Sequence, residues 1–460
     1  MRSFLPMTAL LLAATPALSQ EPPEQRPQQQ QPAPAQPAPA QPPPEQPQQR
    51  VLTLAEALRT AQERQPQLRQ AQASTTAANA RVDQSFSSLL PQVSANASYQ
   101  RSFSSNTNFG TADPTSGIIR REGFNVGATV NQLIWDFGRT TGRWRASQET
   151  AAAQRSNEQQ TQSDVLANVQ TVYFNALAQQ VLVQVAEETL RNQQAHLDQV
   201  QAQVQVGTRP EIDLVQQRTL VANARLQLIQ ARNNSATLKA QLNQAMGVEG
   251  PTDYAVQEEV VGLVRGEDEP TGTLVDMAFQ NRADLAATDH QLLAQEQQLS
   301  ATRGNFFPSI NVSLSANESG PTPAELQWGI TGQVGLSWPL FQGGITLAQM
   351  REQRANISSV QAQRDALRQQ VRLEVERAQL AVHAARESVT AADEALTNAR
   401  ERLRMAEGRY RAGVGNIIEL SDAQLSATNA EVQRVQASYD LATARTELAR
   451  SLGQQTGPQT

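Results

Sequence analysis

The sequence contains no cysteine among its 460 residues. That absence excludes disulfide bonds, thiolate metal sites, a cysteine nucleophile and a lipid-modified N-terminal cysteine. Lysine is nearly absent as well, because Lys239 is the only one and arginine supplies the rest of the positive charge. With a formal net charge of -6 and no basic stripe, the chain offers no surface that suits nucleic acid.

Long apolar runs are also missing. No segment beyond the N-terminus has 18 or more consecutive apolar residues, which argues against a transmembrane helix. If such a chain crosses a membrane, it must do so as closed β-structure, because lipid cannot satisfy the backbone groups of an open strand edge.

The two ends of the chain differ in composition from its body. Residues 1–19 combine Arg2, a mostly apolar stretch and a small-x-small pattern at Ala17 and Ser19, which is typical of a signal peptide. Residues 20–50 are rich in Pro and Gln and have almost no large apolar residue, which predicts a disordered, polyproline-like leader. Residues 454–460 are expected to form a flexible tail.

The body of the chain is an internal duplication. Adding 217 carries residues 66–91 onto 283–308, and adding 206 carries residues 135–247 onto 341–453. The two offsets differ by 11, so one loop of the first half, between Pro91 and Trp135, is longer by that amount. We therefore expect a first repeat over 51–247, an inter-repeat segment over 248–272 and a second repeat over 273–453.

Each half has two segments in which apolar residues alternate with small or polar ones. They begin at Val93 and Phe124 in the first half and at Ile310 and Trp328 in the second. The alternation predicts strands with lipid on one face and water on the other, although a half-buried strand of a soluble sheet has the same pattern. Each run is about ten residues long, which is the length a tilted strand needs to span a bilayer.

Very long helices are expected after the strands. Residues 143–206 and 345–407 contain no Pro or Gly, and a helix of that length would extend ~95 Å at 1.5 Å per residue. Each should turn at Gly207 or Gly413 and return over 211–246 or 416–452, and shorter helices are expected over 68–89 and 285–303. A seven-residue apolar repeat through both long segments predicts coiled-coil packing; its members are Val183, Leu190, Leu197, Val204, Val389, Leu396, Leu403 and Tyr410.

Four strands cannot surround a water-filled lumen, because even a barrel of about eight strands is filled by its own side chains. Three copies pooling their strands are the smallest symmetric set that leaves a lumen. The predicted fold is therefore a mixed α and β membrane protein. Four strands per protomer would form a trimeric 12-stranded outer-membrane barrel, which continues into a long periplasmic α-helical barrel of antiparallel coiled-coil hairpins.

Aromatic residues cluster at one end of the predicted strands. That position suits the interface between lipid and water, and ordinary core aromatics are the alternative. The candidates for the membrane interface are Trp135, Phe306, Phe307, Trp338 and Phe341.

The order of these elements and several short motifs resemble the TolC-type outer-membrane efflux protein family. LTLAEAL at Leu52–Leu58 resembles the family's opening helix, and NRADL at Asn281–Leu285 resembles its Asn-Arg-Pro-Asp-Leu motif, with Ala283 where Pro is common. The family's strand starts resemble LPQVSANASY and FPSINVSLSA. Its strand-to-helix exits resemble WDFGR and FQGGI, and its hairpin tips resemble VGTRPEIDL and AGVGNIIEL. No single motif is specific, but the ordered set covers Val51–Gly453.

The resemblance implies a homotrimeric channel in the bacterial outer membrane, in contact with outer-membrane lipid and with its helices in the periplasm. It implies two further partners, a periplasmic adaptor protein and an inner-membrane pump or ABC transporter, in a tripartite efflux or type I secretion system. It implies no cofactor and no metal. The transported substrate, whether drug, metal or protein, is left open.

The resemblance also implies a pore constriction near the second hairpin tip. Glu419 and Asp422 are three residues apart, which places both carboxylates on one helix face, and the family has an acidic pair here in the tightest part of its tunnel. Three copies would form stacked acidic rings that select cations. The alternative is a solvated helix start, where acids suit the helix dipole. Asp213 is the first-half counterpart of Glu419 and a third candidate.

The hairpin tips themselves are candidate contacts for the adaptor, namely Val206, Gly207, Thr208, Arg209, Gly413, Val414 and Gly415. The glycines also serve the turn itself. For Arg209 the alternative is a pairing with acids that holds the tunnel shut.

An enzyme is not indicated, because the sequence has no phosphate loop, metal-ligand spacing or nucleophile motif, and His196, His290 and His383 lie on separate segments. The main alternative to a channel is a trimeric coiled-coil adhesin or a periplasmic structural spacer without transport activity. Such an adhesin keeps its barrel strands together at one end of the chain, whereas here they are split between the halves.

Overall fold

The computed structural model describes residues 50–105, 118–259 and 262–454. The predicted signal peptide over 1–19 lies outside these residues, as do the leader up to residue 49, the part of the longer first-half loop over 106–117 and the tail from residue 455.

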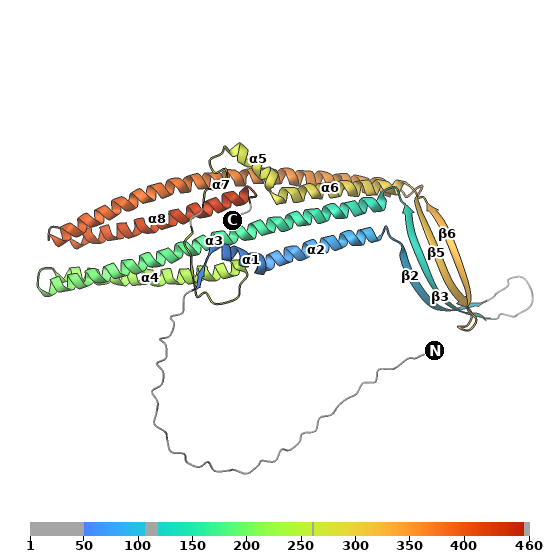
Figure 1. Ribbon diagram of the computed structural model, residues 1–460, viewed down its shortest axis with the longest axis horizontal. Helices are drawn as coiled ribbons and strands as arrows, with labels where there is room; N and C mark the ends of the chain where they lie inside the picture. Colours follow the sequence, from blue (N-terminus) through green and yellow to red (C-terminus); the bar gives the residue numbers. More distant parts are fainter. Residues whose placement is uncertain (1–49, 106–117, 260–261, 455–460) are drawn as a thin grey trace, which may run out of the picture. The chain divides into compact units, whose positions relative to one another are not determined.

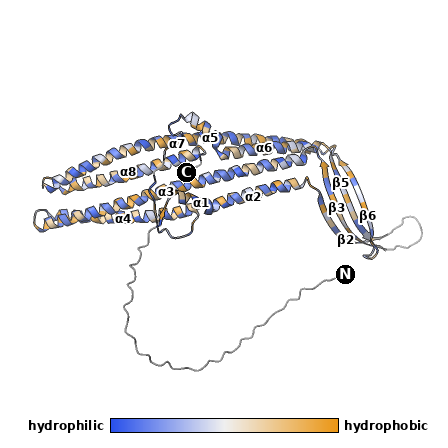
Figure 2. Cartoon of the chain, in the orientation of Figure 1, coloured by the Kyte–Doolittle hydropathy of each residue, from blue (hydrophilic) through white to orange (hydrophobic). Residues whose placement is uncertain are grey.

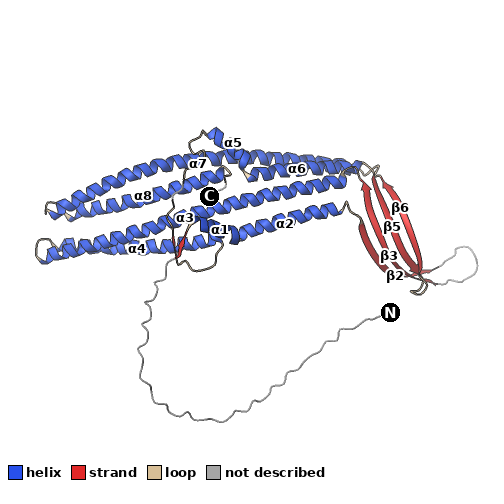
Figure 3. Cartoon of the chain, in the orientation of Figure 1, coloured by secondary structure: helices blue, strands red, loops and turns tan. Residues whose placement is uncertain are grey.

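The described residues form two similar series of helices and strands (Figures 1 and 3). The first series is β1 (Arg50–Leu52), α1 (Leu54–Arg64), α2 (Pro66–Ser87), β2 (Gln92–Ser105), β3 (Ile118–Trp135), α3 (Arg139–Gln205) and α4 (Glu211–Met246). The second is β4 (Tyr254–Val256), α5 (Thr271–Asn281), α6 (Ala283–Arg303), the short 3-10 helix η1 (Gly304–Phe306), β5 (Ser309–Gly320), β6 (Gln327–Ser337), α7 (Ile345–Arg411) and α8 (Ile417–Ser451). Adding 206 to the bounds of α3 gives those of α7, and adding 217 to the bounds of α1 gives those of α5.

Strands β2, β3, β5 and β6 form one antiparallel sheet in that order, so each half contributes a neighbouring pair. The halves join where β3 pairs with β5, from Phe124 opposite Gly320 to Trp135 opposite Ile310. The strand register places apolar side chains on one face of the sheet, where Val93 is 72% and Val334 is 74% exposed. Hydrophobic and hydrophilic residues are interspersed along the strands (Figure 2). Among the described strands, the edge strands β2 and β6 have only one neighbour each in this sheet.

The two helical hairpins, α3 with α4 and α7 with α8, turn in the same way. Gly207 and Gly413 have φ values of +75° and +77°, in the left-handed region that glycine enters without steric cost. The next residues, Thr208 and Val414, donate their backbone N–H groups to carbonyls five residues back, at 2.9 and 3.1 Å. This is the Schellman arrangement, which satisfies carbonyl groups that the helix end leaves unpaired.

Helix α3 begins at Arg139 and runs through Gly142 into the segment without Pro or Gly that starts at residue 143. Glycine is needed at this position since α6 lies against α3: a Cβ on Gly142 would stand 2.9 Å from the Cβ of Ala301. Helix α7 likewise continues through Gly408 and ends at Arg411. Helix α3 packs against α2, α4, α6 and α8, so it connects both repeats.

A buried core surrounds Tyr173 where α1 and the parallel β1–β4 pair meet α3. The Tyr173 hydroxyl donates to the carbonyl of Leu52 at 3.1 Å and to that of Gln257 at 2.8 Å. Its counterpart in the second repeat, Gln379, donates its amide to the carbonyl of Glu269 at 2.9 Å. The two repeats therefore use different side chains, Tyr173 and Gln379, at equivalent helix positions to bind equivalent backbone carbonyls.

Among the described residues, none of the helices is both long enough and apolar enough to cross a membrane.

Candidate functional site

The two hairpin tips bring most of the predicted contact residues together. The first tip joins α3 to α4 and the second joins α7 to α8. Val206 and Val414 lie at the tips and are 73% and 71% exposed. Thr208 turns its hydroxyl back to the carbonyl of Gln203 at 2.9 Å, and the Gly415 N–H donates to the carbonyl of Arg409 at 3.0 Å. Each tip is thus a hydrogen-bonded turn that presents an exposed apolar side chain.

Arg209 of the first tip contacts the end of α7. Its guanidinium carbon lies 4.2 Å from the centre of the Tyr410 ring, and its Nη2 donates to the Tyr410 carbonyl at 2.9 Å. Tyr410 is buried, and within the described ranges its hydroxyl has no hydrogen-bond partner. Burial raises the pKa of the Tyr410 phenol; the charge of Arg209 opposes this shift and that of Asp213 adds to it. The stack and the hydrogen bond link the two hairpins of one chain.

Asp213 lies in the first turn of α4 and is only 6% exposed. It lines a groove of about 370 Å³ between the tips. The groove is lined by Arg209, Pro210, Ile212, Asp213 and Gln216 from the first tip and by Gly415, Asn416, Ile417 and Ile418 from the second. The structure therefore places Asp213 in this groove with Arg209, and buries it within the chain.

The two acids of the second tip differ in their surroundings. Asn416 caps α8 by accepting the Glu419 N–H at 2.7 Å, and the Glu419 carboxylate lies 3.1 Å from Nε of Arg409. Asp422 is exposed, and in the described part of the chain it makes no hydrogen bond or ion pair. Of the two acids of the second tip, Asp422 is thus the one whose charge is not compensated within the described part of the chain.

A second link between the hairpins lies deeper in the coiled coil. The Gln217 side-chain amide of α4 donates to the carbonyl and side-chain oxygens of Gln193 on α3, at 3.0 and 2.7 Å. Gln193 in turn donates to the side-chain oxygen of Gln424 on α8 at 3.1 Å. All three side chains are buried, so a slip of one helix would leave amide groups unpaired. The amide triad therefore fixes the register of three helices.

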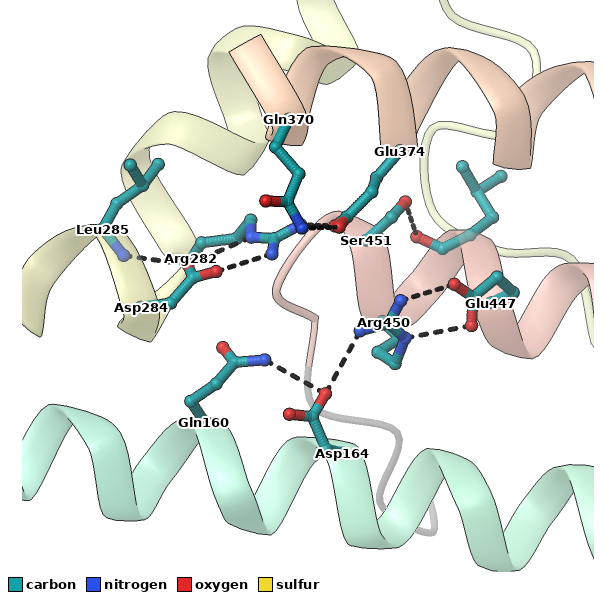
Figure 4. A network of polar contacts seen from close by, with 11 residues as sticks. Gln160, Asp164, Arg282, Asp284, Leu285, Gln370, Glu374, Glu447, Arg450 and Ser451 are labelled. Atoms are coloured by element: carbon teal, nitrogen blue, oxygen red, sulfur yellow. Dashed lines mark hydrogen bonds and ion pairs between the residues drawn. The ribbon is translucent and has the colours of Figure 1, made fainter. Parts of the chain in front are cut away.

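Figure 4 shows a third link, near the far end of α8. Arg450 lies 3.2 Å from Asp164 of α3 and also binds Glu447. Beside it, the buried Arg282 of the NRADL motif binds Glu374 at 2.5 Å and Asp284 at 2.6 Å. Burial raises the pKa of Glu374, but hydrogen bonds from Arg282 and Gln370 and the charges of Arg282 and Arg450 outweigh it, so that pKa lies below its ordinary value.

The predicted interface aromatics lie where the strands meet the helices, and four of them take part in aromatic or hydrogen-bond contacts there. Phe137 connects two of them, at 6.0 Å between ring centres from Trp135 and stacked at 4.9 Å on Phe307. Trp338 donates its indole N–H to the carbonyl of Phe306 at 3.0 Å, and Phe341 is 89% exposed. The sequence analysis did not include Phe137 among the interface aromatics. The WDFGR motif could have indicated it, because this motif places an aromatic residue between Asp136 and Gly138, whose φ is in the left-handed region.

The sequence singled out Arg209 as a tip residue and Tyr410 as a member of the apolar repeat, but it gave no indication that the two side chains touch. Tyr410 was one member of an apolar repeat, and its counterpart at the 206 offset is the aliphatic Val204. The amide triad was missed altogether. Its signal is a pair of glutamines, Gln193 and Gln217, at positions where the second repeat has alanines.

The fold defines a duplicated protein in which two helical hairpins extend from one shared sheet. The family model for the outer membrane efflux protein matches residues 57–248 and 274–454, and the chain belongs to this family. Membership confirms the resemblance inferred from the ordered motifs, and with it the predicted location in the outer membrane. The family comprises efflux proteins rather than enzymes.

Individual relatives agree with this assignment. The solvent efflux pump outer membrane protein SrpC of Pseudomonas putida is 27% identical over 248 residues, 53% of this chain and 50% of that protein. The cation efflux system protein CusC of Escherichia coli is 23% identical over 259 residues, 54% of this chain and 55% of that protein. In these alignments the chain spans about half the length of the curated relatives it matches.

Solved structures share the fold over most of the chain. A membrane protein from Pseudomonas aeruginosa has a TM-score of 0.77 and 21% identity, covering 87% of this chain and 90% of that one. The CmeC outer membrane channel of Campylobacter jejuni has a TM-score of 0.76 and 19% identity, covering 88% and 86%. These likenesses confirm the predicted combination of a few β-strands with long α-helical hairpins in one chain.

Proposed function

We propose that the chain is one protomer of a homotrimeric outer-membrane channel. It would export substrates delivered by a periplasmic adaptor and an inner-membrane pump or ABC transporter, in a tripartite efflux or type I secretion system. The observation that carries the proposal is the four-stranded sheet, which has one exposed apolar face and one face of amides and hydroxyls. Its open edges β2 and β6 require a partner strand in lipid, and other copies of the chain supply one.

The helices support the same assembly. Phe174 of α3 is 1% exposed, whereas its counterpart Leu380 of α7 is 62% exposed. Val435 of α8 is 6% exposed, whereas its counterpart Ile229 of α4 is 59% exposed. Within the described chain α3 packs against α8, but α7 and α4 make no extensive contact. If α7 of one copy packs against α4 of the next, both exposed positions become buried in the same way as their counterparts.

The tips then have two roles. Three copies would bring the acids Glu419 and Asp422 around a constriction that favours cations, with Asp213 in the groove behind it. The apolar tips at Val206 and Val414, with Thr208, Gly207, Gly413 and Gly415, would contact the adaptor. The lumen would discriminate only by size and charge, so the choice of substrate would lie with the pump.

The aromatic cluster of Trp135, Phe306, Phe307, Trp338 and Phe341 would mark the periplasmic interface of the membrane. Trp135 and Trp338 suit that depth because the indole ring contacts hydrocarbon while its N–H can meet a polar group, and the three phenylalanines would lie on the hydrocarbon side.

The proposal is tested by expressing the full chain and separating the membranes. We expect the protein in the outer-membrane fraction, extracted only by detergent, trimeric by native mass spectrometry, and conducting in planar bilayers. A water-soluble monomer without conductance would refute the proposal, and a detergent-dependent trimer without conductance would favour a structural spacer or an adhesin.

A further inference from the structure

We infer that Arg121 of three copies forms a ring of positive charge at the outer mouth of the barrel, and that this ring binds polyphosphates. The inference rests on the proposed trimer, in which the face of amides and hydroxyls, called here the polar face, lines the lumen. Arg121 lies near the start of β3, at the end opposite to the one that leads into α3.

The strand register places Arg121 on the polar face. It is paired with Ser102 of β2, which continues the run of amides and hydroxyls that begins at Gln92. The next residue of β3, Glu122, is paired with Arg101. Opposed residues share a face and successive residues alternate between faces. The Glu122 carboxylate lies 3.3 Å from Nε of Arg101 on the apolar face, so this ion pair is on the other side of the sheet from Arg121.

Arg121 is the one charged residue on the polar face from Gln92 to Ser102, from Arg121 to Leu133 and along β5 and β6. The other positions of that face in these ranges hold serine, threonine, asparagine, glutamine, glycine and a single leucine. Arg121 is exposed, and within the described residues its side chain makes no hydrogen bond or ion pair. In the trimer this stretch of the barrel wall would therefore present one uncompensated charge from each copy.

A second group of aromatic residues indicates the height of Arg121. Tyr99 and Phe124 lie on the apolar face with ring centres 4.8 Å apart, and Trp328 on the same face is 76% exposed. Phe124 and Trp135 are eleven residues apart on β3. That separation corresponds to ~37 Å along a strand and to ~28 Å across the membrane at a tilt of ~40°, close to the ~25 Å apolar band between two aromatic girdles.

Arg121 lies three residues beyond Phe124, and hence outside this apolar band. The pairing of β3 with β5 ends at Phe124 and Gly320, whereas its pairing with β2 continues to Ile118. Arg121 therefore belongs to the section of the β2–β3 hairpin that extends past β5 and β6. In the trimer this section surrounds the mouth of the lumen on the side away from the helices.

The chemistry of a guanidinium ring suits a polyvalent anion. Rings of arginine favour anions in pores, and each guanidinium can donate two parallel hydrogen bonds to a phosphate group. At ~0.1 M salt a charge acts over only ~10 Å, so a small ion can pass along the middle of a wide lumen. A polyphosphate chain, by contrast, can contact the wall and the neighbouring copies at once. The acids proposed for the constriction give the helical end the opposite preference.

The test is block of current through full-length trimers in planar bilayers. The helices cannot cross the bilayer, so protein added to one side leaves its barrel mouth on the other. We expect linear inorganic polyphosphate to block from the mouth side only. Arg121→Gln should raise the half-blocking concentration about fivefold or more at ~0.01 M salt, where the Debye length is ~30 Å. The difference should fall to within about twofold at ~1 M salt, where that length is ~3 Å.

Arg101→Gln is the matched control, because it removes the same group from the neighbouring strand on the opposite face. It should leave the half-blocking concentration within about twofold, and Arg121→Lys, which keeps the charge, should retain most of the block. A conducting trimer that polyphosphate does not block from the mouth side overturns the ring and leaves the channel intact. Equal block in Arg121→Gln and the unchanged protein, or an equal loss in Arg101→Gln, does the same. A monomer without conductance overturns the channel, and the ring with it.

Discussion

Arg209 and Tyr410 join the two hairpins of one chain, with the guanidinium carbon 4.2 Å from the centre of the phenol ring. Arg209→Ala removes this stack and the hydrogen bond to the Tyr410 carbonyl, which together should contribute about 1–3 kcal/mol. Amide hydrogen exchange in the last turn of α7 should therefore become faster. Arg209→Lys keeps the charge but loses the planar guanidinium group, so its exchange rate should lie between those of the unchanged protein and Arg209→Ala. Equal exchange in all three would show that the contact does not stabilise the tip.

The Tyr410 hydroxyl should be dispensable. It is buried and, among the described residues, has no hydrogen-bond partner. Because an unpaired buried hydroxyl costs free energy, Tyr410→Phe should leave the thermal midpoint unchanged or raise it by the equivalent of about 1 kcal/mol. Tyr410→Ala, which removes the ring, should lower stability by about 3–5 kcal/mol. A clear loss of stability in Tyr410→Phe would mean that the hydroxyl has a partner, such as ordered water.

The two acids proposed for the constriction should contribute unequally to block by polyvalent cations applied from the periplasmic side. Glu419 is paired with Arg409 at 3.1 Å, whereas Asp422 is exposed and uncompensated within the described chain. Asp422→Ala should therefore weaken block more than Glu419→Ala, and the double variant should weaken it most. Bilayer recordings measure this directly, with the exposed Asp440→Ala on the same helix as control. Block that is unchanged in the double variant would remove both acids from the constriction.

Glu374 should give the chain an acid-sensitive component of stability. Its pKa in the folded protein is below the ordinary value of 4.5, which the carboxyl has in the unfolded chain. The stabilisation is therefore fully present above the unfolded pKa and is lost as pH falls through the lower, folded pKa. Glu374→Gln should lower the free energy of unfolding by about 1–3 kcal/mol near neutral pH, and by progressively less as the pH falls. Thermal melts across pH test this, with the exposed Glu376→Gln of the same helix as control; a penalty independent of pH would contradict it.

Two glycines near the second tip should respond to alanine in opposite directions. Gly413 has a φ of +77° and open space around a Cβ, so Gly413→Ala should cost about 1 kcal/mol or more through backbone strain alone. Gly408 lies within α7, also with open space, and Gly408→Ala should stabilise the chain by about 0.5–1 kcal/mol. Thermal unfolding of the two variants measures both effects, and the same sign for both would contradict the role of φ.

Most of the fold could be predicted from the sequence because its signals are long and periodic. The return helix predicted over 211–246 has those bounds in the structure, and the four alternating segments lie in the four strands of the sheet. The Pro- and Gly-free segment starts only at residue 143, and no local pattern indicates that α3 runs through Gly142, because the close approach of Ala301 to this glycine is a tertiary contact. The parallel pairing of β1 with β4 joins segments about 200 residues apart, and no local pattern indicates it.

The site was predictable as a list of positions but not as a set of contacts. The turn glycines follow from their neighbours in sequence. Arg209 meets Tyr410, and Gln193 meets Gln424, only because α3 and α8 pack side by side in one register. That register is set by the whole interface, so single residues give no sign of it. The burial of Asp213, which was grouped with the exposed acids, has the same origin.

The pairing of β3 with β5 has a consequence for the order of folding. The whole first hairpin lies between these strands along the chain, so they meet only after a long loop has closed. Each hairpin, by contrast, grows from a tight turn through contacts between near neighbours, which form quickly. The helices should therefore assemble while the strands of the sheet are still apart. Completion of the sheet should be the slow step, at which the chain is most prone to aggregate.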